Sequence, residues 1–339
     1  MPQGSRAIPL WLLLTAAVVL AFLVHVGVGS EFWYSPAKIL TVIFAGPPRM
    51  DDVSGAFPDQ LIIWNLRLPR ACAAALVGAN LGSVGAAFQA LFRNPLADPY
   101  VVGISSGAAV GGVIASMLGI WAIAGGFAGI GLAFLTALAS LGLVVAIARA
   151  QGVLALSTLL MAGVAVGSFL WALITFLLVS SGQDAGRVLF WLLGSLVSID
   201  WPRVGTLALF GAVGFAFLAG RSRALTVFAV GEESAARLGV STEAVKWTVL
   251  LAGSGMAAAA VASVGIIGFV GLFVPHICRR LTGPDMKRLL PASALMGAVG
   301  LLIADLLAQR AIPDREINVG IVTALIGAPF LVALLRRKG

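Results

Sequence analysis

Charged residues are scarce in this sequence. Only 11% of its 339 residues are charged, whereas 60% are hydrophobic and the mean hydropathy is +1.04. A soluble domain carries about a quarter charged residues, so this composition excludes a soluble globular domain. It predicts an all-α, multi-pass membrane protein, which we treat as a single domain over residues 1–339.

Cysteine and histidine are also rare, with two of each. We expect Cys72 and Cys278 near opposite membrane faces, about 30 Å apart, which excludes a disulfide between them. They belong to no metal-ligand cluster, so no metal site is expected. No lysine follows a glycine, which excludes the phosphate-binding loop of an ATPase. Metalloprotease, nucleophile-elbow and dinucleotide motifs are missing too, so no catalytic residue and no directly bound cofactor is expected.

The net charge of +8 does not indicate a nucleic-acid-binding protein. The basic residues are scattered between hydrophobic segments instead of gathering on one polar face. Membrane topology explains them better. Membrane lipids, and not nucleic acid, are therefore the expected surroundings.

Apolar runs separated by polar or proline-rich breaks predict ten membrane spans. The segment 266–281 is short and contains glycines and Pro275, which is typical of a helix beside a transport pathway or of a kinked packing helix. The apolar centre of 182–201 is too short to cross, and it predicts an external or interfacial helix. The ten spans are approximately 8–28, 71–91, 101–119, 121–148, 154–179, 201–219, 245–264, 266–281, 289–308 and 317–335.

The distribution of charge sets the expected orientation. With the N-terminus inside, 14 of the 22 basic residues and five acidic residues lie on the inner side, while eight of each sign lie outside. An excess of Lys and Arg marks the cytoplasmic side, so both termini are predicted to be cytoplasmic. Arg67, Arg70, Arg310 and Arg315 then lie outside the cell.

Glycine is abundant, and much of it recurs at four-residue spacing inside the apolar runs. Of the 41 glycines, Gly78 and Gly82 form one such pair, and Gly163 and Gly167 form another. Small residues on one face of a helix let neighbouring backbones approach closely in lipid. We therefore expect these glycines to pack helices together.

Asp305 is the clearest ionisable residue inside the predicted spans. A buried Asp can mark a proton or ion site, and it can also be a hydrogen-bonded contact between helices. A proton-coupled carrier that uses Asp305, and a non-transporting membrane scaffold, thus remain alternatives to a driven transporter. If transport is driven by ATP, the motor must be a separate subunit.

The stretch NLRLPR at residues 65–70 places two arginines at the mouth of an apolar segment. Leu68 precedes a proline and should be extended, and Pro69 suits the first helical position, so the helix should begin beside Arg70. Cations at this end oppose the helix dipole, and on the outer side they also oppose the positive-inside tendency. Arg67 and Arg70 therefore call for a functional reason.

The longest internal loop, within residues 221–246, contains a predicted short helix. Acidic residues suit the start of a helix, and Gly239 suits its C-terminal cap. Such a helix can serve as a rigid lever in another protein's groove, although an ordinary solvated loop remains open. The residues concerned are Gly231, Glu232, Glu233, Ser234, Ala235, Arg237, Leu238 and Gly239.

Several segments resemble the membrane permeases of ABC importers for iron-siderophores, haem and vitamin B12, which have the type II importer fold. The resemblance runs from about residue 60 to the C-terminus, with the segments in the family's order. They are NLRLPR, GAAFQALFRNPLADPYVVGISSGA, GEESAARLGV, IGFVGLFVPHICRRLTGPDMKRLLPASALMGA and VGIVTALIGAPFLVALLRR.

The resemblance implies a ten-span subunit of a prokaryotic inner membrane that pairs with a second copy as a homodimer. Two cytoplasmic ATP-binding subunits, which use ATP and Mg²⁺, would lie below it, and a soluble substrate-binding protein above it. Transport by alternating access would carry a metal chelate, with an iron-siderophore as the first choice and haem or cobalamin next.

The resemblance also implies roles for particular residues. Glu232 to Gly239 would form the coupling helix that enters the ATPase cleft. Asn94, Leu96, Leu156 and Ser157 would lie near the cytoplasmic gate.

Arg67 and Arg70 would pair with glutamates of the binding protein. The third docking arginine of the family falls on Gln309, with Arg310 one position later and Arg315 as a substitute.

Overall fold

The computed structural model describes residues 4–28, 33–48, 58–149, 154–180, 185–312 and 315–336. Within these ranges the chain is helical, apart from turns and two isolated β-bridges. The longer helices are α1 (Gly4–Gly27), α4 (Leu68–Leu91), α5 (Ile104–Met117), α6 (Phe127–Ala148), α7 (Leu156–Ser180), α9 (Trp201–Gly220), α12 (Thr242–Val264), α13 (Val270–Thr282), α14 (Met286–Arg310) and α15 (Val319–Arg336). The shorter elements are α2 (Pro36–Ala45), α3 (Pro58–Ile62), η2 (Ile63–Arg67), η3 (Pro99–Val102), η4 (Ile120–Gly126), α8 (Ala185–Leu192), α10 (Ser222–Phe228) and α11 (Glu232–Arg237).

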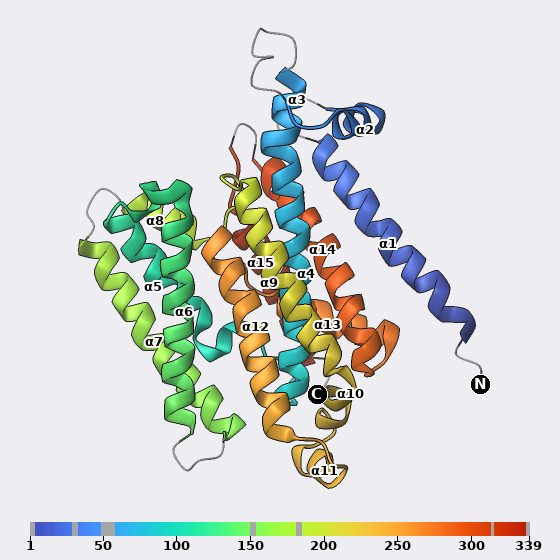
Figure 1. Ribbon diagram of the computed structural model, residues 1–339, viewed down its shortest axis with the longest axis vertical. Helices are drawn as coiled ribbons and strands as arrows, with labels where there is room; N and C mark the ends of the chain where they lie inside the picture. The colour runs from blue at the N-terminus through green and yellow to red at the C-terminus, as the bar shows by residue number, and fades with distance from the viewer. Residues whose placement is uncertain are drawn as a thin grey trace.

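Helices α4 and α12 form the centre of the molecule (Figure 1). In their most apolar stretches 78% and 72% of the residues are buried, against 22% in each of α1 and α7. The outer helices turn large apolar side chains outward, for example Met161 and Phe169 of α7. Such helices suit a lipid environment, because exposed apolar surface of this extent is unfavourable in water.

The predicted spans correspond to helices of different lengths. Seven helices in the described ranges are long and apolar enough to cross a membrane, namely those containing 10–27, 59–91, 127–148, 156–180, 201–220, 242–264 and 286–310. The predicted spans 101–119 and 317–335 correspond to the shorter apolar helices α5 and α15. Within 182–201 the described residues form the short helix α8 followed by a non-helical stretch up to α9, and the external position of α8 stays a prediction. The amphipathic helix α2 was not predicted.

The prediction for 266–281 as one helical segment is wrong in its first part. Only α13 is helical, and residues 265–269 are not. Gly265 and Phe269 have φ of 76° and 68°, values that an α-helix does not allow. The freed backbone groups find other partners: Ile266 donates its N–H to Leu192, and Tyr100 donates its hydroxyl to Ile267. This is the condition under which irregular backbone is tolerated inside a membrane protein.

The prediction that Leu68 is extended is also wrong. Leu68 has helical angles, and α3, η2 and α4 form one continuous helical segment from Pro58 to Leu91. The turn before Pro69 is π-helical, and the Leu68 N–H bonds to the carbonyl of Ile63. A π-turn widens the helix by one residue, which accommodates a proline ring without ending the helix.

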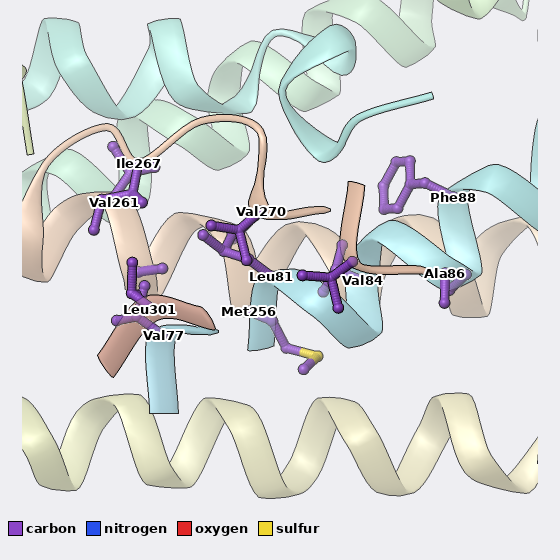
Figure 2. Close-up of a cluster of buried hydrophobic side chains, with 14 of the residues drawn as sticks. Val77, Leu81, Val84, Ala86, Phe88, Met256, Val261, Ile267, Val270 and Leu301 are labelled. Carbon is purple, nitrogen blue, oxygen red and sulfur yellow. The ribbon is translucent and has the colours of Figure 1, made fainter. Parts of the chain in front are cut away.

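Glycines bring α4 and α14 into backbone contact, as the four-residue spacing predicts. A Cβ atom on Gly78 would overlap the carbonyl of Gly297, and one on Gly297 would overlap the carbonyl of Gly78. A Cβ on Gly82 would likewise overlap the carbonyl of Ser293. The same two helices contribute to a core of medium-sized apolar side chains, which includes Val77, Leu81, Val84, Met256, Val261, Val270 and Leu301 (Figure 2).

The two ends of the molecule differ. Helices α2, α3 and α8 lie toward one end, and α10 and α11 lie at the opposite end (Figure 1). Helix α1 begins, and α15 ends, in the half of the molecule that carries α11. We call these the outer end and the inner end.

Candidate functional site

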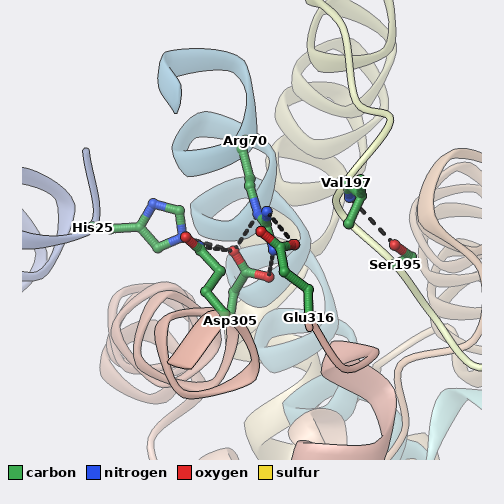
Figure 3. Close-up of polar contacts among 7 residues, drawn as sticks. His25, Arg70, Ser195, Val197, Asp305 and Glu316 are labelled. Atoms are coloured by element: carbon green, nitrogen blue, oxygen red, sulfur yellow. Dashed lines mark hydrogen bonds and ion pairs between the residues drawn. The ribbon is translucent and has the colours of Figure 1, made fainter. Parts of the chain in front are cut away.

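Arg70 holds two carboxylates at the outer end. Its Nε and Nη2 donate to Asp305 Oδ2 and Oδ1 at 2.8 and 3.0 Å, and its Nη1 donates to Glu316 Oε2 at 2.8 Å (Figure 3). The Arg70 side chain is 13% exposed, so it is largely engaged within the chain. Paired hydrogen bonds to one carboxylate fix both the position and the orientation of the guanidinium.

Asp305 is a contact between helices. Its side chain is 1% exposed and, besides Arg70, receives hydrogen bonds from His25 of α1 at 2.7 Å and Gln309 of α14 at 2.9 Å. A buried carboxylate is tolerated when cationic and hydrogen-bonding groups surround it. Of the two interpretations that the sequence left open, the structure therefore favours the interhelical contact.

Arg67 caps the end of another helix. Its Nη1 donates to the carbonyls of Val26 and Gly27 at 3.0 and 2.9 Å, and its guanidinium lies over the ring of Tyr34. The last carbonyls of a helix lack partners within the helix, so a guanidinium there stabilises the end of α1. Arg67 thus ties α1 to the segment that precedes α4.

The two remaining outer arginines differ from Arg67 and Arg70 in exposure. Arg310 and Arg315 are exposed, whereas Gln309, which occupies the place of the family's third docking arginine, is buried against Asp305 and His25. The four predicted docking arginines thus fall into two pairs. Arg67 and Arg70 hold the chain together, and Arg310 and Arg315 lie on its surface.

The predicted inner helix is present as α11, and it projects from the inner end (Figure 1). Ala235 is buried, while Glu233, Ser234, Arg237 and Leu238 are exposed. Arg237 and Glu233 form an ion pair at 2.6 Å within the helix, and both side chains are more than three quarters exposed. Gly239 has φ of 78° and follows the helix as the predicted cap.

Two exposed apolar side chains lie at the ends of α11. Val230 is 81% exposed and Leu238 is 72% exposed. Gly231 joins Val230 to the first turn, where Glu232 is half-buried. A short helix with apolar ends and a charged face is suited to insertion into a groove of another protein.

Lys246 is the inner-end residue that the sequence did not single out. Its Nζ lies 2.5 Å from Glu232 Oε1 and 2.9 Å from Glu243 Oε1, and it donates to the carbonyl of Leu154 at 2.9 Å. The side chain is 1% exposed. A lysine near the start of an apolar run, three residues after Glu243, was the available signal, but the sequence does not place Leu154 beside it.

The predicted gate residues lie on two segments toward the inner end. Asn94 follows α4 and accepts a hydrogen bond from the Leu96 N–H at 2.9 Å, which forms a local turn. Leu156 and Ser157 begin α7, and Ser157 is exposed. In the part of the chain that the structure describes, no hydrogen bond joins these two pairs, so their joint role at a gate stays a prediction.

Asp98 closes the loop that contains Asn94 and Leu96. Its Oδ1 accepts the N–H of Tyr100 at 2.9 Å and caps η3. Burial raises the pKa of Asp98 to about 6, because the charged carboxylate is desolvated.

A metal centre does not form among the described residues, where no group of three His, Cys, Asp or Glu side chains is placed to hold an ion. Cys72 and Cys278 are both free thiols.

The helical fold, with its seven helices long and apolar enough to cross a membrane among the described residues, and the family match that follows define a membrane permease of the ABC-importer class. The FecCD transport family matches residues 17–337, and the chain belongs to that family.

Relatives and a solved structure agree with this assignment. The ABC transporter permease protein YvrB of Bacillus subtilis is 44% identical over 82% of this chain and 79% of its own length. The cobalamin import system permease protein BtuC of Halobacterium salinarum is 43% identical over 89% of this chain and 80% of its own. A metal-chelate type ABC transporter, solved in an inward-facing conformation, superposes with a TM-score of 0.82 at 30% identity and covers 96% of this chain and 98% of its own.

Proposed function

We propose that this chain is the permease subunit of an ATP-driven importer that moves a metal chelate inward, with cobalamin as the first substrate to test. The names of the relatives support this choice, since a cobalamin permease is 43% identical and a metal-chelate transporter shares the fold. Iron-siderophores, which the sequence resemblance placed first, and haem are the next candidates.

The observation that carries the proposal is α11. It is a short, capped and exposed helix at one end of a chain that has no phosphate-binding loop of its own. Residues 231–239 would enter a cleft of a cytoplasmic ATP-binding subunit, with Val230 and Leu238 as apolar contacts. The inner end then faces the cytoplasm, and both termini lie on that side.

The assembly we propose contains two copies of this chain, two ATP-binding subunits and one soluble binding protein at the outer end. The substrate would pass between the two copies. ATP binding would close the motor subunits and move α11, and the helices would then rearrange around the pathway by alternating access. Asn94, Leu96, Leu156 and Ser157 would form the inner gate.

Docking of the binding protein would use Arg310 and Arg315 at the surface and Arg67 and Arg70 beneath it. Since Arg70 already holds Glu316, an acidic group of the binding protein would compete with Glu316 for the Nη1 atom. Docking would therefore replace one carboxylate with another and not create a new charge pair.

Reconstitution tests the proposal. Liposomes that contain the permease and its ATP-binding subunit, with the binding protein outside, should accumulate labelled cobalamin when ATP is inside. A motor variant that lacks its phosphate-loop lysine should not do so. Accumulation driven by a proton gradient, without the motor, would instead identify a secondary carrier. A complex that forms without any substrate flux would identify a scaffold.

A further inference from the structure

Lys246 joins three segments that are separate in the sequence. Glu232 is the first residue of α11, Glu243 lies in the first turn of α12, and Leu154 lies two residues before α7. Each of them places one oxygen within 2.9 Å of the same ammonium group. An ammonium has three N–H donors, so all three are matched.

The arrangement suits a permanent link. The Lys246 side chain is 1% exposed, while those of Glu232 and Glu243 are 33% and 49% exposed. A buried charge is costly unless it is paired, so the lysine holds these partners, whereas the carboxylates keep part of their hydration. Lys246 is therefore the anchor of the cluster.

The attachment of α11 to its surroundings depends on this anchor. The other ion pair of α11, between Glu233 and Arg237, is internal to the helix and exposed. In the described ranges, the contact between Glu232 and Lys246 is the one polar side-chain contact that joins α11 to another helix. Ala235 adds a small buried apolar contact.

The third partner of Lys246 lies just before two of the predicted gate residues in the sequence. The carbonyl of Leu154 belongs to the segment that leads into α7, and α7 opens with Leu156 and Ser157. The side chain of Leu154 is buried, so Lys246 holds its carbonyl and the apolar core holds its side chain. A displacement of α11 along the line from Glu232 to Lys246 would therefore also pull on the start of α7.

We propose that Lys246 is a positioning residue that transmits the displacement of α11 to the inner end of α7. This inference rests on the proposed function, in which a motor subunit moves α11. It predicts that α11 and the start of α7 move together. When the contacts of Lys246 are removed, the two segments should move independently of each other.

A distance measurement tests this independently of transport. Spin labels at Ala236 and Thr158, both exposed, report on α11 and α7, in a background where Cys72 is replaced by serine. In the reconstituted complex, the distance between them should stay constant between the nucleotide-free and ATP-bound states. In Lys246→Met, which keeps the length of the side chain and removes its donors, the distance should change with nucleotide. A wild-type distance that changes with nucleotide would overturn the inference, as would a constant distance in the variant.

The ratio of substrate imported to ATP hydrolysed gives the second readout. Lys246→Met should lower this ratio at least fivefold while ATP hydrolysis stays within about twofold of wild type, and Lys246→Arg should restore part of it. Glu232→Gln removes the charge of the α11 contact and leaves the Glu243 and Leu154 contacts of Lys246 in place, so it serves where Lys246→Met does not assemble, and it should lower the ratio as well. Lys287→Met, at an exposed lysine of α14 that belongs neither to the cluster nor to residues 231–239, is the matched control and should leave the ratio unchanged.

The outcomes separate the two proposals. If wild type imports nothing with ATP, the proposed function fails. If wild type imports and Glu232→Gln keeps the full ratio, only the role of Lys246 fails. A parallel loss of hydrolysis and import in Lys246→Arg and Glu232→Gln would assign Lys246 a structural role and overturn the inference.

Discussion

Arg70 and Asp305 lie 235 positions apart in the sequence, and they are joined by two parallel hydrogen bonds of 2.8 and 3.0 Å. This pair connects α4 to α14 at the outer end, and His25 adds α1 to the same contact. A residue that the sequence resemblance assigns to docking is thus also part of the framework of the helix bundle.

The first prediction concerns this buried pair. Asp305→Asn should lower the stability of the protein by about 3 kcal/mol, because Arg70 and His25 keep their donors and lose the charge that they face. Thermal unfolding of the purified protein measures the effect. Lys38→Gln is the control: it removes an ion pair with Asp59 whose side chains are 48% and 43% exposed, and it should cost at most about 1 kcal/mol. Equal shifts for the two variants would contradict this account of Asp305.

The second prediction concerns the partner that Arg70 shares with the surface. Glu316→Gln replaces the carboxylate that competes for Arg70 Nη1 with a neutral amide. The variant should therefore bind the soluble binding protein several-fold more tightly at low salt. A titration of the binding protein against the reconstituted permease measures this. Asp59→Asn, at the same end but paired with Tyr34 and Lys38, is the control that should change little. Weaker binding in Glu316→Gln would show that Glu316 supports docking and does not compete with it.

The third prediction concerns the backbone contact between α4 and α14. Gly297→Ala should destabilise the protein by about 1–3 kcal/mol, because the new methyl group would overlap the carbonyl of Gly78. Gly300→Ala lies on the same helix with nothing within 4 Å of the new Cβ atom, so it should be neutral or stabilising by up to about 1 kcal/mol. Thermal unfolding of the two variants in one detergent compares them. A tolerated Gly297→Ala would show that the two helices can separate at no cost.

The fourth prediction is a pH dependence at Asp98. The pKa of this carboxyl is raised to about 6 from 3.8, so the folded protein binds the extra proton between about pH 4 and 6 and its stability falls as pH rises through that window. Asp98→Asn keeps an oxygen that can cap η3 and cannot ionise. The variant should be more stable than wild type at pH 7.5, and the difference should vanish near pH 4. A difference that is independent of pH would mean that Asp98 is not the group responsible.

Composition and spacing were sufficient for the class of fold and for the local structure of α11. Apolar length predicts membrane helices, and the position of Gly239 predicts where α11 ends, because both features depend on residues close together in the sequence. The glycine spacing likewise predicts that Gly78 packs against a neighbour. It does not identify the neighbour as Gly297, because that contact depends on how two distant helices cross.

The errors have two causes, an unusual local turn and hydrogen-bond partners that are distant in the sequence. Leu68 precedes a proline and is nevertheless helical, because the adjacent π-turn accommodates the proline ring. Residues 265–269 are unwound because Leu192 and Tyr100 satisfy their backbone groups. The sequence does not indicate a role for Lys246, because one of its partners is the carbonyl of Leu154, 92 positions away. Leu192, Tyr100 and Leu154 are far away in the sequence, so the neighbouring residues do not reveal these contacts.

The central claim is that a separate motor acts on this chain at α11, and site-specific photo-crosslinking tests it most directly. A photoreactive amino acid at Leu238, which is 72% exposed beside α11, should form an adduct with an ATP-binding subunit in native membranes. The same amino acid at Phe44, which is 86% exposed on α2 at the outer end, should form none. An ATP-binding subunit captured from position 44 and not from position 238 would contradict the account.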